Sequence, residues 1–131
     1  MIAEIRAVLE TDPDVLYGLV FGSAARGQLH ATSDLDVALE LRRGAPRDLH
    51  RLGRLIRQLE TAAGRPVDLV LLDEATAPVA YRIFRDGVVV AERDHAALAA
   101  RKARAILEYL DFRPIEERCA TGVLRAAARG R

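Results

Sequence analysis

Residues 34–41 (DLDVALEL) alternate strictly between aliphatic residues and polar or small ones. Because successive side chains of a β-strand point to opposite faces of its sheet, a period of two predicts a strand with one buried face. The aliphatic face carries Leu35, Val37, Leu39 and Leu41. The other face brings the carboxylates of Asp34 and Asp36 together.

Three other segments have the length and composition of strands. Residues 15–21 (VLYGLVF) are almost continuously apolar, which is typical of a strand covered on both faces. Residues 67–72 (VDLVLL) are apolar except for Asp68, and residues 88–91 predict a short last strand.

Apolar residues recur at helical spacing elsewhere in the chain. A first helix is predicted from Ile2, and it ends before Pro13, which disfavours a continued helix. Residues 49–63 carry an apolar stripe that begins at Leu49 and stops at Gly64, a favoured residue just after a helix.

Polar residues in suitable places predict the starts of further helices. Ser23 would cap a short helix, and Asp73 or Thr76 would cap a longer one that runs to Gly87. The C-terminal part of the chain is also predicted to be helical, with a break before a final helix over about residues 115–129.

Strands that alternate with helices predict an α/β or α+β layer structure. The chain has 131 residues, half of them apolar, which is the size of one domain with one core. We expect a single domain over residues 1–131. The part that carries the carboxylates would span about residues 15–92, and a helical C-terminal segment would span about residues 94–131.

The charges nearly balance, with 20 basic and 19 acidic residues and a net charge of +1. No global field therefore favours direct binding to nucleic acid or to a membrane. The longest apolar runs are strand-sized, which is too short for a membrane span. The single cysteine, Cys119, and the acidic N-terminal segment favour the reducing cytoplasm.

The sequence Gly22-Ser23 follows the first predicted strand, and ten residues separate it from Asp34-Leu35-Asp36. A glycine lets a phosphate approach the backbone closely, and free N–H groups at a helix start bind phosphate oxygens. Two carboxylates at positions i and i+2 of a strand can bind the same hard cation, and such a pair suits Mg²⁺ held jointly with substrate phosphates. This combination favours phosphoryl-type transfer.

Asp68 interrupts an otherwise apolar strand, where an unpaired carboxylate would be costly, so we expect it to lie near a bound cation as a third ligand. Other interpretations stay open. Asp34 and Asp36 could cap a turn or face water, and an edge strand could expose Asp68. Arg26 could contact a triphosphate or lie on the solvated surface.

The sequence contains Gly-Ser, then ten residues, then Asp-x-Asp, and finally a lone aspartate in a later strand. This pattern resembles the nucleotidyltransferase superfamily that includes DNA polymerase beta. The segment Ala25-Arg26-Gly27 after Gly-Ser resembles its minimal (MNT) members. This resemblance implies a small mixed sheet flanked by helices. It also implies that Asp34, Asp36 and Asp68 are the catalytic and metal-binding residues, with ATP and Mg²⁺.

The same resemblance implies that Gly22 and Ser23 contact the triphosphate and that Arg26 neutralises it. The stretch YLDFRP at residues 109–114 resembles the C-terminal part of MNT antitoxins, which pair with HEPN toxins. In that family the antitoxin transfers AMP to a tyrosine of the HEPN ribonuclease and thereby blocks it. The partner would then be a cognate HEPN toxin, in a homo- or hetero-oligomer.

Two other functions are compatible with the sequence. The chain could neutralise a toxin by covering it without catalysis, or it could transfer nucleotides to a small-molecule or RNA acceptor. A pure binding protein would gain nothing from three clustered carboxylates, which favours an enzyme.

Overall fold

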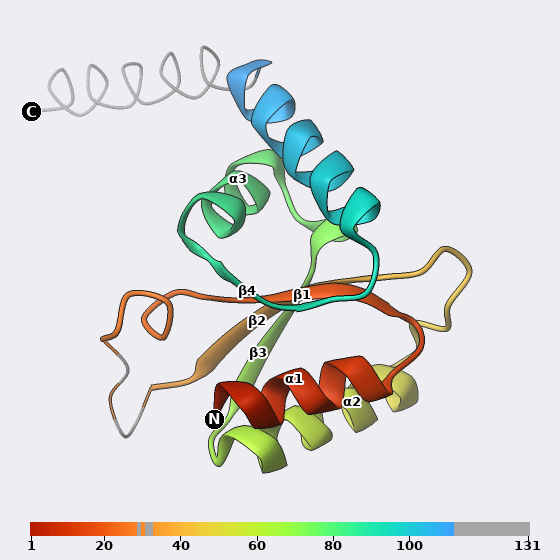
Figure 1. Ribbon diagram of the computed structural model, residues 1–131, viewed down its shortest axis with the longest axis vertical. Coiled ribbons are helices and arrows are strands. Elements are labelled where there is room, and N and C mark those ends of the chain that lie inside the picture. The colour runs from red at the N-terminus through yellow and green to blue at the C-terminus, as the bar shows by residue number, and fades with distance from the viewer. Residues whose placement is uncertain (29, 31–32, 112–131) are drawn as a thin grey trace, which may run out of the picture.

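The computed structural model describes residues 1–28, 30 and 33–111, and in this part of the chain helices flank a four-stranded sheet (Figure 1). The elements are, in chain order, α1 (Ile2–Thr11), β1 (Val15–Phe21), β2 (Leu35–Leu41), α2 (Leu49–Ala63), β3 (Val67–Leu71), the 3₁₀ turn η1 (Leu72–Glu74), α3 (Ala77–Asp86) and β4 (Val88–Glu92). A further helix covers residues 95–111.

The strand order in the sheet is β3-β2-β1-β4. Strand β1 is antiparallel to both of its neighbours, whereas β2 and β3 are parallel. A parallel pair needs a crossover connection, and helix α2 provides it. The predicted small mixed sheet is confirmed, and β1 is largely buried, as its nearly continuous apolar sequence requires.

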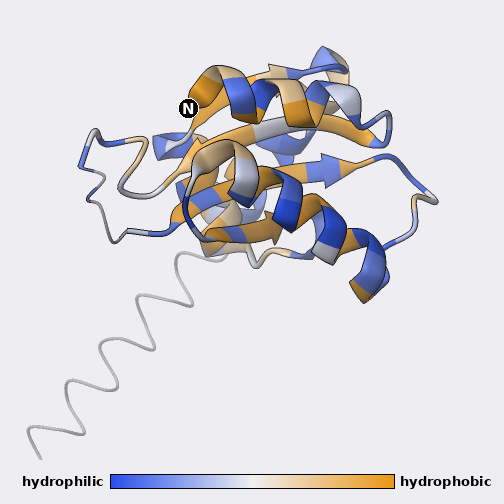
Figure 2. Ribbon diagram, turned by 90° about the horizontal axis from the view of Figure 1, so that it is seen from below, coloured by the Kyte–Doolittle hydropathy of each residue, from blue (hydrophilic) through white to orange (hydrophobic). Residues whose placement is uncertain are grey.

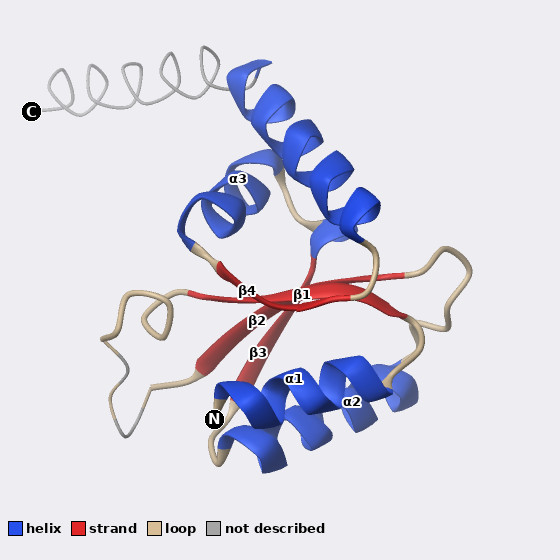
Figure 3. Cartoon of the chain, in the orientation of Figure 1, coloured by secondary structure: helices blue, strands red, loops and turns tan. Residues whose placement is uncertain are grey.

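Helices cover both faces of the sheet, with α1 and α2 on one side and α3 and the helix of residues 95–111 on the other (Figure 3). Hydrophobic residues are concentrated in the strands, while the loops are mostly hydrophilic (Figure 2). The alternation in β2 divides its side chains between two cores. Val37 and Leu39 belong to the α1–α2 core, while Ala38 lies with Tyr17 and Leu19 beneath α3.

Helix α2 begins and ends as its sequence predicts. The side chain of Asp48 accepts a hydrogen bond from the N–H of Arg51, and Gly64 ends the helix in the left-handed conformation at φ 69°. The first residue of the predicted stripe is an exception, because Leu49 is 90% exposed. Leu49 lies in the first turn and makes no contribution to the core, while Leu55 and Leu59 are fully buried.

The short helix predicted from Ser23 is wrong, because residues 22–27 form consecutive turns. Positive φ angles at Gly22 (70°) and Gly27 (69°) take the backbone out of the helical region at both ends of this segment. Thr76 does precede α3, although its side chain makes no capping hydrogen bond. The final helix predicted over residues 115–129 lies outside the described residues.

None of the helices in the described part of the chain combines the length and the hydrophobicity that a bilayer crossing requires.

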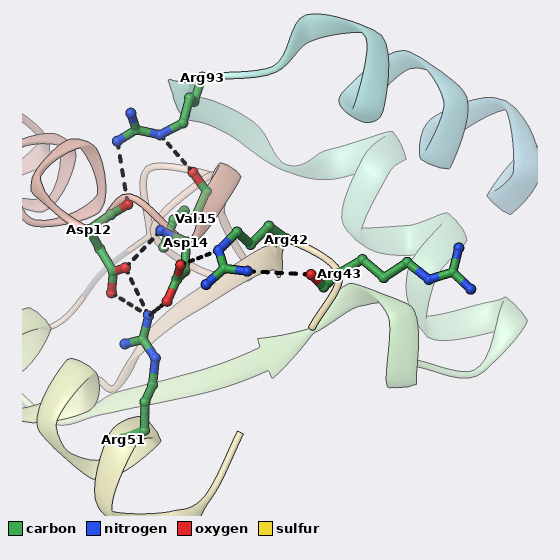
Figure 4. Close-up of polar contacts among 7 residues, drawn as sticks. All are labelled: Asp12, Asp14, Val15, Arg42, Arg43, Arg51 and Arg93. Carbon is green, nitrogen blue, oxygen red and sulfur yellow. Dashed lines mark hydrogen bonds and ion pairs between the residues drawn. The ribbon is translucent and has the colours of Figure 1, made fainter. Parts of the chain in front are cut away.

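The turn between α1 and β1 is bound by arginines from three other parts of the chain (Figure 4). Arg51 of α2 contacts Asp12 at 2.7 Å and Asp14 at 3.4 Å, and Arg42 at the end of β2 donates to Asp14 at 2.5 Å. Arg93, which follows β4, donates to the carbonyl oxygen of Asp12 at 3.3 Å. This network joins α1, α2, β2 and β4 at the end of the sheet where β1 begins.

Arg51 is 9% exposed, whereas Arg54 lies on the exposed surface of the same helix. Replacing Arg51 by Met should lower the free energy of unfolding by about 2 kcal/mol, because Asp12 and Asp14 lose a cation in half-buried surroundings. The matched variant Arg54→Met should change the free energy of unfolding by less than about 0.5 kcal/mol. Chemical denaturation of both variants measures the difference, and equal losses would show that the network does not stabilise the fold.

Candidate functional site

The sheet register places the predicted carboxylates next to one another. Asp36 lies on β2 directly beside Asp68 on the parallel strand β3, and on its other side it faces Phe21 at the end of β1. Asp34 precedes β2 by one residue. The end of β1 lies beside the starts of β2 and β3. This arrangement brings Gly22, Asp34, Asp36 and Asp68 to the same end of the sheet.

Gly22 lies directly against the carboxylate of Asp36. A Cβ atom built on Gly22 would lie 2.2 Å from Oδ2 of Asp36, which is far inside any permitted contact. The φ angle of 70° is a second reason for glycine, since side-chain-bearing residues rarely adopt it. With the carboxylate in this position, the backbone can pass beside it because position 22 has no side chain.

The turn that follows presents backbone N–H groups. The N–H of Arg26 bonds to the carbonyl of Gly22 at 3.3 Å, and the N–H of Gln28 bonds to the carbonyl of Ser23 at 2.8 Å. Within the described residues, the N–H groups of Ser23, Ala24 and Ala25 have no hydrogen-bond acceptor. Successive free N–H groups in a turn suit an anion such as phosphate, so the expectation that this segment binds phosphate does not depend on the predicted helix.

The pKa of Asp36 is raised above the ordinary aspartate value. Burial contributes most, followed by the negative charges of Asp68 and then Asp34, while the positive charge of Arg26 acts in the opposite direction. Asp68 and Asp34 therefore both repel the charged form of Asp36. Arg26 is exposed, and its Nε donates to Oε1 of Gln28 at 3.2 Å, so its charge is near the site without an ion pair to Asp36.

The environment of Asp68 differs from the one predicted from the sequence. Its side chain is exposed, because β3 is an edge strand of the sheet. The cost of burying a carboxylate is therefore no reason to expect a cation beside it. The argument that remains is position, since the register places Asp68 beside Asp36.

The carboxylates fit Mg²⁺ by their chemistry, although they do not form a preformed cage. In residues 1–28, 30 and 33–111, no group of three or more His, Cys, Asp or Glu side chains is arranged to hold a metal ion. Mg²⁺ prefers oxygen ligands, and many enzymes bind it through one or two carboxylates and the phosphates of the substrate. The oxygen donors of Asp34, Asp36 and Asp68 fit such an ion when another ligand supplies the remaining coordination positions.

Arg65 contacts this region and was not predicted from the sequence. It lies between α2 and β3, and its Nη1 donates to the carbonyl oxygens of His30 at 2.8 Å and Ser33 at 3.3 Å. Both carbonyls belong to the loop that leads to Asp34. No local pattern marks Arg65, because its partners lie more than 30 residues away in the sequence.

The close contact at Gly22 predicts a specific loss of stability. Gly22→Ala should destabilise the fold much more than Gly27→Ala, since both glycines have nearly the same φ but only Gly22 lies against another side chain. The backbone strain alone costs about 1–2 kcal/mol at either position. Thermal unfolding of the two variants measures the additional cost of displacing Asp36, and equal losses would contradict the close approach.

The raised pKa of Asp36 predicts how stability depends on pH without metal. The folded state binds a proton at Asp36 more tightly than the unfolded state, so stability is lost as pH rises from the ordinary aspartate pKa through the raised one. Asp36→Asn removes the charge at almost constant shape. Its melting temperature should equal or exceed that of wild type at neutral pH, and the difference should shrink in acid. A variant that melts lower than wild type at neutral pH would contradict this electrostatic account.

Solved structures of several proteins resemble this fold. A toxin-antitoxin crystal structure with AMP-PNP has a TM-score of 0.80 and 21% identity, with 94% of this chain and 98% of that chain covered. A structure of a tri-AMPylated Shewanella oneidensis HEPN toxin in complex with an MNT antitoxin has a TM-score of 0.74 and 18% identity, with coverages of 94% and 95%. At these identities, the likeness shows a shared fold.

A structure described as a "putative minimal nucleotidyltransferase" is 31% identical with a TM-score of 0.57, and the match covers 66% of this chain and 88% of that chain. No curated protein sequence matches the chain at a significant level. The family model described as "Polymerase beta, Nucleotidyltransferase" matches residues 3–96, which include every strand of the described residues and all the carboxylates of the site. The chain therefore belongs to the polymerase beta nucleotidyltransferase family.

Proposed function

We propose that this chain is the antitoxin of a HEPN/MNT toxin-antitoxin module and that it transfers AMP from ATP to a tyrosine of its cognate HEPN toxin. The observation that carries the proposal is the position of Asp36, which lies between the Gly22 turn and Asp68. The solved structures add support, because one of the similar complexes contains AMP-PNP and another contains a tri-AMPylated HEPN toxin.

In this proposal Asp34 and Asp36 hold Mg²⁺, and the turn from Gly22 to Arg26 binds the triphosphate through its free N–H groups. The bound metal would neutralise negative charge on the phosphate oxygens. Arg26 adds a positive charge from the exposed side of the turn. These groups hold the α-phosphorus where an acceptor hydroxyl can attack it in line.

The transfer forms one bond and breaks one. The tyrosine oxygen bonds to the α-phosphorus, the bond from that phosphorus to the oxygen bridging to the β-phosphate breaks, and pyrophosphate leaves. The hydroxyl proton passes to Asp68 and from there to water. The exposure of Asp68 suits this role, since a carboxylate at an edge strand can be reached by an acceptor on a partner protein and can release its proton to solvent.

The proposal is tested with ATP labelled at the α-phosphate, Mg²⁺ and the cognate toxin. Wild type should label the toxin and release pyrophosphate. The variant Asp34→Asn/Asp36→Asn should transfer no detectable label, and Asp68→Asn should be slower by about a hundredfold or more. Glu10→Gln, which removes an exposed acid on α1, should label the toxin normally.

Each contrary result would identify a different site, a different mode of action or a different acceptor. Labelling by the double Asn variant at the wild-type rate would show that the site is elsewhere. Loss of toxin activity in the complex without any labelling would identify an antitoxin that acts by binding. Labelling of RNA or a small molecule in the absence of toxin would identify a different acceptor.

A further inference from the structure

Asp34 lies outside the regular part of the sheet. It is exposed and precedes the first residue of β2, so its own side chain gains no support from a buried position. A metal ligand must nevertheless be held close to its working position, because ligands that have to be ordered on binding lower the affinity for the ion. Neighbouring residues must therefore fix the backbone of Asp34.

The connection between α2 and β3 binds the backbone on both sides of Asp34. Before Asp34, the carbonyl oxygen of Ser33 accepts a hydrogen bond from Nη1 of Arg65 at 3.3 Å. After Asp34, the N–H of Leu35 donates to the carbonyl oxygen of Pro66 at 2.9 Å. The adjacent residues Arg65 and Pro66 thus hold the residues on either side of Asp34.

Arg65 also holds the loop further upstream. The same Nη1 donates to the carbonyl oxygen of His30 at 2.8 Å, and the N–H of Ser33 donates to that carbonyl at 3.1 Å. One guanidinium therefore gathers the carbonyl oxygens of His30 and Ser33. The Nε of Arg65 is buried and has no partner among the described residues, so this part of the side chain lies away from solvent.

The connection itself is held firmly. Gly64 ends α2 with an N–H bond to the carbonyl of Glu60 at 2.8 Å, and the Glu60 carboxylate accepts the N–H of Val67 at 3.1 Å. Arg65 and Pro66 lie between these two anchored residues. Arg65 is therefore fixed to the end of α2 and the start of β3, and it can transmit that rigidity to the loop.

We propose that Arg65 is a positioning residue, which sets the backbone of Asp34 for metal binding by gathering the carbonyl oxygens of His30 and Ser33. This inference rests on the proposed function, in which Asp34 is a metal ligand. Arg65 acts through backbone geometry, and it is not part of the group that contacts the nucleotide.

The test measures metal dependence without catalysis. The ligand is a fluorescent derivative of α,β-methylene-ATP, in which the bond that nucleotidyl transfer breaks cannot be cleaved. Fluorescence anisotropy follows its binding to the full-length protein while Mg²⁺ is varied. For Arg65→Gln, the Mg²⁺ concentration that gives half-maximal binding should rise about tenfold, as is typical when a residue that orients a metal ligand is lost. Binding at saturating Mg²⁺ should remain.

Two further variants separate positioning from general stability. Arg57→Gln removes an exposed arginine from α2 and should leave the Mg²⁺ requirement unchanged. Arg65→Lys keeps the charge and one donor, so its Mg²⁺ requirement should lie between those of wild type and Arg65→Gln. The lysine variant also decides the question if Arg65→Gln fails to fold.

The contrary outcomes are distinct. If Asp34→Asn shifts the Mg²⁺ requirement but both Arg65 variants bind as wild type does, the positioning role is overturned and the proposed site stands. If Asp34→Asn also binds as wild type does, Asp34 is no metal ligand, and the proposed site and the role of Arg65 both fall.

Discussion

The pairing of β2 with β1 on one side and β3 on the other is the constraint on which the site depends. It places Asp36 between Phe21 and Asp68, although these residues come from three separate parts of the chain. A slip of one residue would turn Asp36 into the core and Val37 out of it. The aliphatic face of β2 excludes that slip, so the same alternation that builds the core also orients the carboxylate.

The two ends of β1 differ in their electrostatics. At its start, Asp12 and Asp14 are neutralised by Arg42 and Arg51, and this network draws four elements together. At its end, burial and then the charges of Asp68 and Asp34 raise the pKa of Asp36, and the basic residue that lowers it is the exposed Arg26. The ion pairs thus stabilise the fold at the end away from the carboxylates. At the other end, a bound cation would reduce the repulsion that Asp34 and Asp68 exert on Asp36.

Periodicity in the sequence predicts what depends on local patterns. The alternation of residues 34–41 and the stripe ending at Gly64 were sufficient for β2 and α2. The exposure of Asp68 was not predictable in this way, because it depends on the order of strands in the sheet. Likewise, Gly22 and Gly27 adopt positive φ angles that replace a helix by turns, and the contacts of Arg65 join distant segments. How Asp34, Asp36 and Asp68 act chemically remains a prediction.

The contact between Gly22 and Asp36 also makes two sequence positions interdependent. With Asp36 in its observed position, any side chain at position 22 would force the carboxylate to move. A relative of this protein that has lost the carboxylate at position 36 is released from that exclusion, and its glycine is free to be replaced. A larger residue at position 22 would therefore be a sequence marker of a relative that has given up this carboxylate and kept the sheet.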